Sequence, residues 1–316
     1  MTLARSASRA KGVSASLPGG VPLPYPPRVH PRALAILSLP LLALSGAAAA
    51  AEPVPPGGVP DFMPARTLAL GASIGVAAGN EGIYVNPGAI AARKRYSIEG
   101  MLLHDRRGAE NIDRFYGASV VDSQTSSITA GFSYLRDQGA LYSGNVFHLA
   151  LAGNLAEAFH IGVTGKLFNL QGQTSYQAGN VDAGAFWQVA ELFSLGFAGY
   201  NLLSGGNSIV SPKAAGAGFA VGSDRSVQVT GDWRADFDRA GGKTTNRYSG
   251  GAEGLVANLV VLRGGFMHDD TLSTNWWSAG FGVVTPSAAL DVGYRQSTTD
   301  TSAREIAATL KVFVNQ

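Results

Sequence analysis

The chain has 316 residues, a formal net charge of +2 and no cysteine. The small net charge gives no electrostatic indication of nucleic-acid binding, and without cysteine there are no disulfide bonds or thiolate metal sites. Glycine occurs 41 times, about twice its average usage, and charged residues make up 15% instead of the usual quarter. This composition favours closely packed strands over soluble helices.

Residues 1–51 have the features of an export signal. Basic residues precede an apolar run, 33–44, which leads into small residues and the alanines that end at Ala51. A charged flank, an apolar core and a small-residue site are the parts of a secretory signal, so we expect cleavage near Ala51. The run is shorter than the roughly 20 residues of a spanning helix. Two alternatives stay open: the run is an interfacial anchor, or translation starts near Val29, because 1–28 is unusually long.

Residues 52–93 lie between the signal and the first strand, and we expect them to form a plug inside the structure that follows. A Pro/Gly-rich stretch is followed by the small-residue run 68–77, which permits close packing. Tyr84, Asn86 and Pro87 come next, and an Asn before Pro favours extended or turn geometry. We interpret these three residues as the junction between the plug and the first strand.

From residue 94 to 316, apolar and polar residues alternate with a period of two, the pattern of strands whose two faces differ. In the clearest stretch, 227–238, Val229, Trp233 and Phe237 share one face. The other face carries Gln228, Thr230, Asp232, Arg234 and Asp236.

The connections between these strands predict their number. Six short turns, near 124–127, 154–159, 190–193, 223–226, 257–258 and 286–287, alternate with seven mostly longer and more polar loops. Thirteen connections join fourteen strands of about ten residues, the length that crosses an outer membrane when tilted. We therefore predict an all-β fold, a closed antiparallel transmembrane barrel of about 14 strands with a short N-terminal plug. A soluble β-sandwich or propeller is the alternative.

The segment before the first strand resembles that of a known family. Alternating small residues, then Tyr84 and the run Asn-Pro-Gly-Ala-Ile-Ala at 86–91, are similar to the corresponding segment of the FadL/PorV superfamily of outer-membrane barrels. The resemblance covers 66–91 by motif and implies a fourteen-stranded barrel with a plug. Three features depart from the family. Gly88 replaces the family's usual Ala, the outward loops are short compared with those of FadL-type transporters, and the last aromatic residue, Phe313, lies three residues before the end of the chain.

Several charged residues fall on the predicted inward face. They would line a polar path, hold the plug, or form a salt-bridged interior with no selective role. The candidates are Lys166, Asp232, Arg234, Asp236, Glu253, Arg295 and Lys311. The histidines are dispersed, and no metal cluster or Ser-His-Asp arrangement is indicated, so we expect neither an enzyme nor a cofactor.

Two functions are compatible with these features. In the first, the barrel passes small hydrophobic molecules across the bacterial outer membrane, as FadL-like proteins do. In the second, it is a secretion or assembly adaptor without transport activity, as PorV- and PorQ-like proteins are. Outer-membrane lipid and lipopolysaccharide would surround the barrel in both cases. The further partner would be a hydrophobic ligand in the first and an envelope protein in the second.

Overall fold

The computed structural model describes residues 62–314, except for 107–111, 140–141, 173–174, 204–210 and 241–242. The predicted export signal with its cleavage site near Ala51, and the first ten residues of the predicted plug, lie outside the described residues. Within the described part, none of the helices has the length and apolar character needed to cross a membrane.

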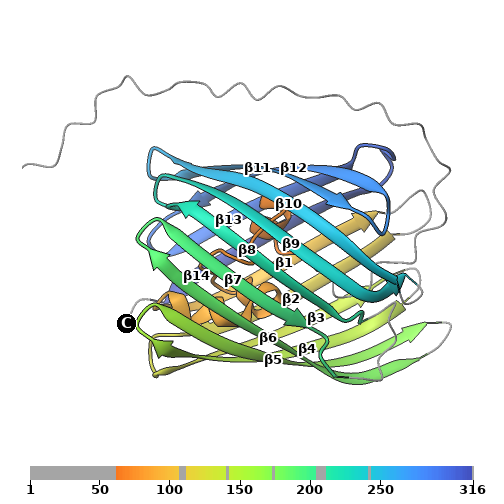
Figure 1. Ribbon diagram of the computed structural model, residues 1–316, viewed down its shortest axis with the longest axis horizontal. Coiled ribbons are helices and arrows are strands. Elements are labelled where there is room, and N and C mark those ends of the chain that lie inside the picture. Colours follow the sequence, from red (N-terminus) through yellow and green to blue (C-terminus); the bar gives the residue numbers. More distant parts are fainter. Residues whose placement is uncertain are drawn as a thin grey trace, which may run out of the picture. The chain divides into compact units, whose positions relative to one another are not determined.

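Fourteen antiparallel strands form a closed barrel in which each strand pairs with its neighbours in the chain and β14 pairs with β1 (Figure 1). The strands are β1 (Tyr96–Arg106), β2 (Ile112–Asp122), β3 (Ile128–Gln138), β4 (Tyr142–Ala156), β5 (Phe159–Gly172), β6 (Tyr176–Ala190), β7 (Phe193–Tyr200), β8 (Ala214–Gly222), β9 (Val227–Ala240), β10 (Lys243–Val256), β11 (Val260–Asp269), β12 (Thr274–Val284), β13 (Ala288–Ser297) and β14 (Arg304–Val314). The predicted fold class is confirmed. Strand length varies more than expected, from 8 residues in β7 to 15 in β4 and β6.

The two faces of the barrel wall differ as the alternation predicts. In β3, Ile128 and Phe132 are 58% and 45% exposed on the outside, whereas Thr129 and Ser133 are buried on the inside. Large apolar side chains cover the outside of the other strands in the same way. Such a surface suits contact with lipid, because the closed barrel satisfies the backbone hydrogen bonds internally.

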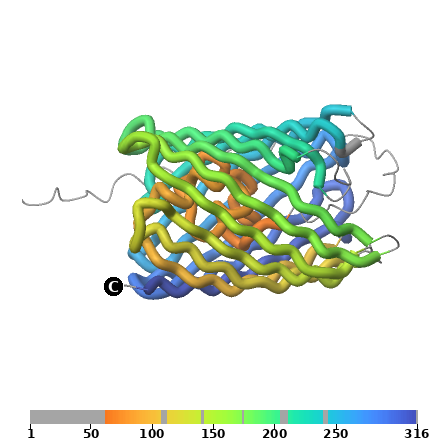
Figure 2. Tube along the Cα trace, turned by 90° about the horizontal axis from the view of Figure 1, so that it is seen from below, coloured from red at the N-terminus to blue at the C-terminus, as the bar shows by residue number. Residues whose placement is uncertain are grey.

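The segment before β1 is partly helical and lies inside the barrel, where Figures 1 and 2 show it in orange. It contains α1 (Ala65–Leu70), α2 (Gly82–Val85) and the 3-10 helix η2 (Pro87–Ala92). Helix α1 ends at Gly71, whose φ of 70° lies in the left-handed region that glycine adopts readily. Helix α2 ends at the extended Asn86, since Pro87 follows it. We call residues 62–92 the plug.

Glycines on the inner wall let the plug backbone approach closely. A Cβ atom at Gly265 or Gly293 would lie 2.3 Å from the carbonyl oxygen of Leu70 and 2.4 Å from that of Ala65, respectively. At Gly196 it would lie 1.9 Å from the carbonyl oxygen of Ile74. Any side chain at these positions would collide with the docked plug. This requirement accounts for part of the high glycine content.

The substitution Gly196→Val is therefore expected to prevent close docking of the plug. We expect it to destabilise the protein by about 1–3 kcal/mol, the usual cost of overpacking. Gly165→Val is the matched control, since a Cβ there meets only the carbonyl oxygen of Leu149, at 3.9 Å, on the outer face. The measurement is the midpoint of thermal unfolding in detergent. Equal midpoints for the two variants would contradict close docking at Gly196.

Candidate functional site: the plug and the lumen cavities

Asn86 connects two parts of the plug to the barrel wall. Its side chain is fully buried, and Nδ2 donates to the carbonyl oxygens of Ile74 and of Ala185 in β6, both at 2.9 Å. Its Oδ1 accepts from the backbone N–H of Gly88 at 3.1 Å and caps η2. Asn86 therefore orders the plug itself and attaches it to β6, several residues before the first strand begins.

Tyr84 and Pro87 contact two further strands. The Tyr84 hydroxyl is 2.5 Å from Oγ of Ser133 in β3, and burial raises the pKa of Tyr84 well above its ordinary value. Pro87 lies against β5, because a Cβ at Gly162 would be 2.5 Å from the Pro87 carbonyl oxygen. The three residues that sequence reasoning assigned to the junction thus contact three different strands.

The seven charged residues expected in the lumen all have their side chains on the inside of the barrel. Four of them contact the plug: Asp232, Glu253, Arg295 and Lys311. The other three form ion pairs along the wall: Lys166 with Asp182 at 2.6 Å, and Arg234 with Asp236 at 2.7 Å. The first group holds the plug and the second forms part of the lumen lining.

A chain of alternating charges links β14 to β10 and β11 through the plug. Lys311 of β14 is 3.0 Å from Glu81 of the plug, and Glu81 is 2.9 Å from Arg66 of α1. Arg66 in turn is 2.5 Å from Glu253 of β10, which also pairs with Arg263 of β11 at 3.0 Å. Because each charge has opposite partners, the plug is fixed to β14 and to β10.

The ionisation of the two plug residues follows from these partners. Burial raises the pKa of Glu81, but Lys311 and Arg66 outweigh burial and hold that pKa well below its usual range. Burial lowers the pKa of Arg66, but Glu253 and Glu81 outweigh it and raise the pKa well above its usual value. Sequence reasoning missed Arg66 and Glu81, although they are the only charged residues in 62–92.

Asp232 binds the part of the plug that has no regular structure. One of its carboxylate oxygens accepts from the backbone N–H groups of Ser73 and Ile74, at 2.6 and 2.9 Å. Buried N–H groups outside helices and sheets need such an acceptor. Asp232 in β9 therefore provides the hydrogen-bond acceptor that backbone carbonyl groups provide within helices and sheets.

Two small cavities lie between the plug and the wall, with volumes of about 70 and about 20 Å³. Phe62, Tyr84 and Tyr200 line both of them. Met63 and Met267 add thioether groups to the larger cavity, and Phe168 adds a ring to the smaller one. The wall of the smaller cavity is thus mainly aromatic, whereas the larger cavity combines its three rings with apolar and polar residues and with Asp232, Arg234 and Arg247.

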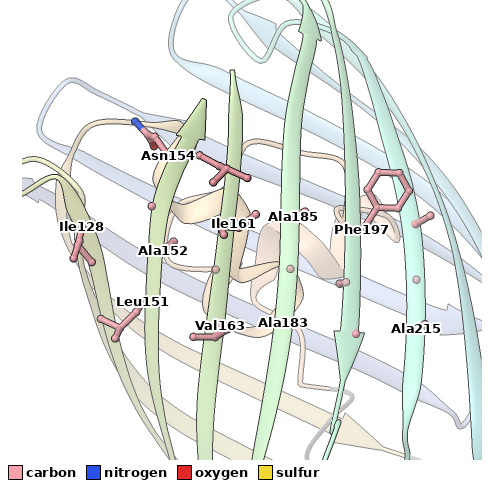
Figure 3. Close-up of a pocket in the computed structure, with 18 of the residues that line it drawn as sticks. Ile128, Leu151, Ala152, Asn154, Ile161, Val163, Ala183, Ala185, Phe197 and Ala215 are labelled. Atoms are coloured by element: carbon pink, nitrogen blue, oxygen red, sulfur yellow. The ribbon is translucent and has the colours of Figure 1, made fainter. Parts of the chain in front are cut away.

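A separate apolar groove of about 1040 Å³ lies on the outer face of β3–β9 (Figure 3). Small residues, among them Ala183 and Ala215, form its floor, and larger ones, such as Leu151, Val163 and Phe197, border it. The plug lies behind these strands. Pairing from β4 to β9 is continuous across the groove, so the groove is a hollow in the wall and not an opening.

No family model and no curated protein matches the chain. Solved structures do match it. The toluene transporter TbuX of Ralstonia pickettii superposes with a TM-score of 0.58 and 10% identity, over 81% of this chain and 97% of TbuX. The toluene transporter TodX of Pseudomonas putida superposes with a TM-score of 0.58 and 11% identity, over 82% of this chain and 99% of TodX. A Pseudomonas aeruginosa FadL homologue superposes with a TM-score of 0.55 and 10% identity, over 79% of this chain and 98% of the homologue. The likeness shows that the fold is that of the FadL-type outer-membrane channels, as the motif at 66–91 implied.

Replacing Arg66 by Met is expected to release the plug. The change leaves Glu81 and Glu253 with one cationic partner fewer each, and breaking a buried pair costs about 3–5 kcal/mol. The measurement is protease cleavage of the plug in the detergent-solubilised barrel. The control is Arg93→Met, since Arg93 pairs with Asp224 where both side chains are more than a quarter exposed. Equal cleavage of both variants would contradict the role given to Arg66.

Acid is expected to weaken docking of the plug only when the pH falls below the ordinary pKa of a glutamate side chain. The pKa of Glu81 is lower in the docked plug than in a released one. Its contribution to the stability of docking is therefore complete above the pKa of the released state, about 4.3, and is lost as the pH falls towards the pKa of the docked state. The current across a planar bilayer should therefore stay low from neutral pH to about pH 4.5 and rise below it. The variant Glu81→Gln should show a smaller change with pH. A rise in wild-type current already at about pH 6 would contradict this assignment.

Proposed function

We propose that this protein lets small hydrophobic molecules pass through the bacterial outer membrane, and that the plug controls their passage. The observation that carries the proposal is the pair of cavities between plug and wall, both of which are lined by the rings of Phe62, Tyr84 and Tyr200. The fold supports it, since solved channels with this fold include TbuX and TodX, which are named toluene transporters. Export by residues 1–51, cleavage near Ala51, a plug over 52–93 and a barrel over 94–316 belong to the same proposal.

The lining of the cavities favours uncharged molecules. Lys166 is neutralised by Asp182, and Arg234 by Asp236, to which it donates two hydrogen bonds at 2.9 and 2.7 Å. An anionic ligand would have to compete with these carboxylates for their cations. A neutral ring or short alkyl chain would instead gain contact with the aromatic walls and lose its exposure to water.

The size of the cavities requires the plug to move. A cavity of about 70 Å³ is smaller than the 150 Å³ or so that holds a benzene molecule in an engineered protein core. The strand pairing beneath the outer groove is uninterrupted, so the wall there provides no gap. Displacement of the plug is therefore the step on which passage would depend.

A second function, that of a secretion or assembly adaptor, is favoured by the short outward connections. In the sequence, two residues separate β9 from β10 and three separate β3 from β4. An envelope protein that co-purifies in equal amount with the barrel would support the adaptor. Uptake of a hydrophobic molecule that depends on plug movement would support the channel.

The channel is tested by tethering the plug. Because the chain has no cysteine, Asn80→Cys with Ser119→Cys provides a single reactive pair, at side chains that lie 2.9 Å apart in the native protein. Cells of a Gram-negative host expressing this variant are expected to take up radiolabelled toluene faster than cells without it. A short bis-methanethiosulfonate reagent should abolish the difference, and a reducing agent should restore it.

The single variant Asn80→Cys, treated in the same way, is the control and should keep its uptake. Uptake that persists in the cross-linked double variant would contradict control by the plug. If expression of the untethered protein gives no increase over the host alone, passage of hydrophobic molecules itself is refuted.

A further inference from the structure

His148 projects into the lumen from the middle of β4 and is 5% exposed. Its direct cross-strand neighbours are Ser133 of β3 and Lys166 of β5. Its Nδ1 atom is buried and has no hydrogen-bond partner among the described residues. A buried polar nitrogen without a partner is unfavourable, so this atom indicates a group that is to be bound there.

Lys166 offers a complementary hydrogen bond beside it. Its ammonium group has three N–H donors, of which one is directed to Asp182 at 2.6 Å and one to Asn201 at 2.5 Å. Lys166 and His148 line the same cavity of about 20 Å³. This corner of the lumen therefore combines a nitrogen without a partner and a donor that has one hydrogen left.

The rest of this cavity is lined by aromatic residues, whose hydroxyl groups are already engaged, and by Asp182, which already pairs with Lys166. The hydroxyl of Tyr84 is bonded to Ser133, and that of Tyr200 donates to the carbonyl oxygen of Val85 at 2.7 Å. Phe168 completes the wall. A ligand here would thus meet ring faces on most sides and hydrogen-bonding groups on one side only.

The ring of Phe62 occupies the space between the smaller and the larger cavity. It lines both, and it packs edge-on against Tyr84 and Phe115 with ring centroids 5.0 and 5.7 Å apart. If Phe62 moved with the N-terminal part of the plug, the two cavities would join. A single aromatic ring from a ligand would then fit the place of the Phe62 ring, with the same edge-on contacts.

We propose that the lumen site selects phenol-type molecules, one aromatic ring bearing one hydroxyl, and that His148 is the residue that determines this specificity. The hydroxyl donates to Nδ1 of His148, in the tautomer with its proton on Nε2, and accepts from Lys166. The proposal rests on the proposed passage of small hydrophobic molecules and specifies which of them bind best.

The test compares phenol with toluene, which differ only by a hydroxyl in place of a methyl group. Binding of each to the full barrel in detergent is measured by titration calorimetry for the wild type and for His148→Leu. We expect the ratio of phenol affinity to toluene affinity to fall about tenfold in His148→Leu, the effect of one lost buried hydrogen bond. Toluene affinity should be kept, which also shows that the variant is folded.

Two further variants sharpen the result. His148→Asn places a carbonyl oxygen near the position of Nδ1 and should restore part of the preference for phenol. His104→Leu, the same change on the outer face of β1, should leave the ratio as in the wild type.

The outcomes distinguish this inference from the proposed function. If toluene binds and the ratio is the same in the wild type and in His148→Leu, selection by His148 is refuted while the hydrophobic site stands. If neither compound binds to the wild type, both the inference and the proposed function are refuted.

Discussion

The chain of buried charges from Lys311 through Glu81 and Arg66 to Glu253 determines where the plug can lie. A buried charge needs an opposite charge beside it, and Arg66 and Glu81 find theirs in each other, in Glu253 and in Lys311. Once these two residues are placed, α1 lies along β10–β13, where Gly265 and Gly293 leave room for its backbone. The ion pairs thus determine the position of α1, and the small residues of the barrel wall let its backbone approach closely.

The rest of the plug depends on hydrogen bonds to its backbone. Segment 71–86 has little regular structure, and its buried N–H and carbonyl groups need partners from side chains. Asp232 provides acceptors from β9, and Asn86 provides donors that join Ile74 to β6. The two halves of the plug are therefore held by different means: the half containing α1 by ion pairs, and the later half by polar groups on a glycine-rich wall.

The barrel could be predicted from the sequence because its physical requirements repeat in every strand. Alternation of side chains and the spacing of turns are local properties, and together they determined the number of strands. The docking of the plug could not be predicted in the same way. Arg66 meets Glu253 across 187 residues of sequence, and no local pattern relates the two. An indirect indication of their role was still present in the sequence. Only two of the 31 residues in 62–92 are charged, and both need a partner when the segment is buried.

The difference between the two halves of the plug has a consequence for passage under the proposed function. Phe62 and Met63, which contact the lumen cavities, directly precede α1, and α1 is held at Arg66. Asn86 and Asp232 act further along the chain, on the segment that continues into η2 and β1. Release of Arg66 would therefore be the first step, and the later half, with the segment around Asn80, would follow. Stepwise opening of this kind breaks fewer contacts at each step than undocking of the whole plug at once, so it is the less costly route from a closed to an open lumen.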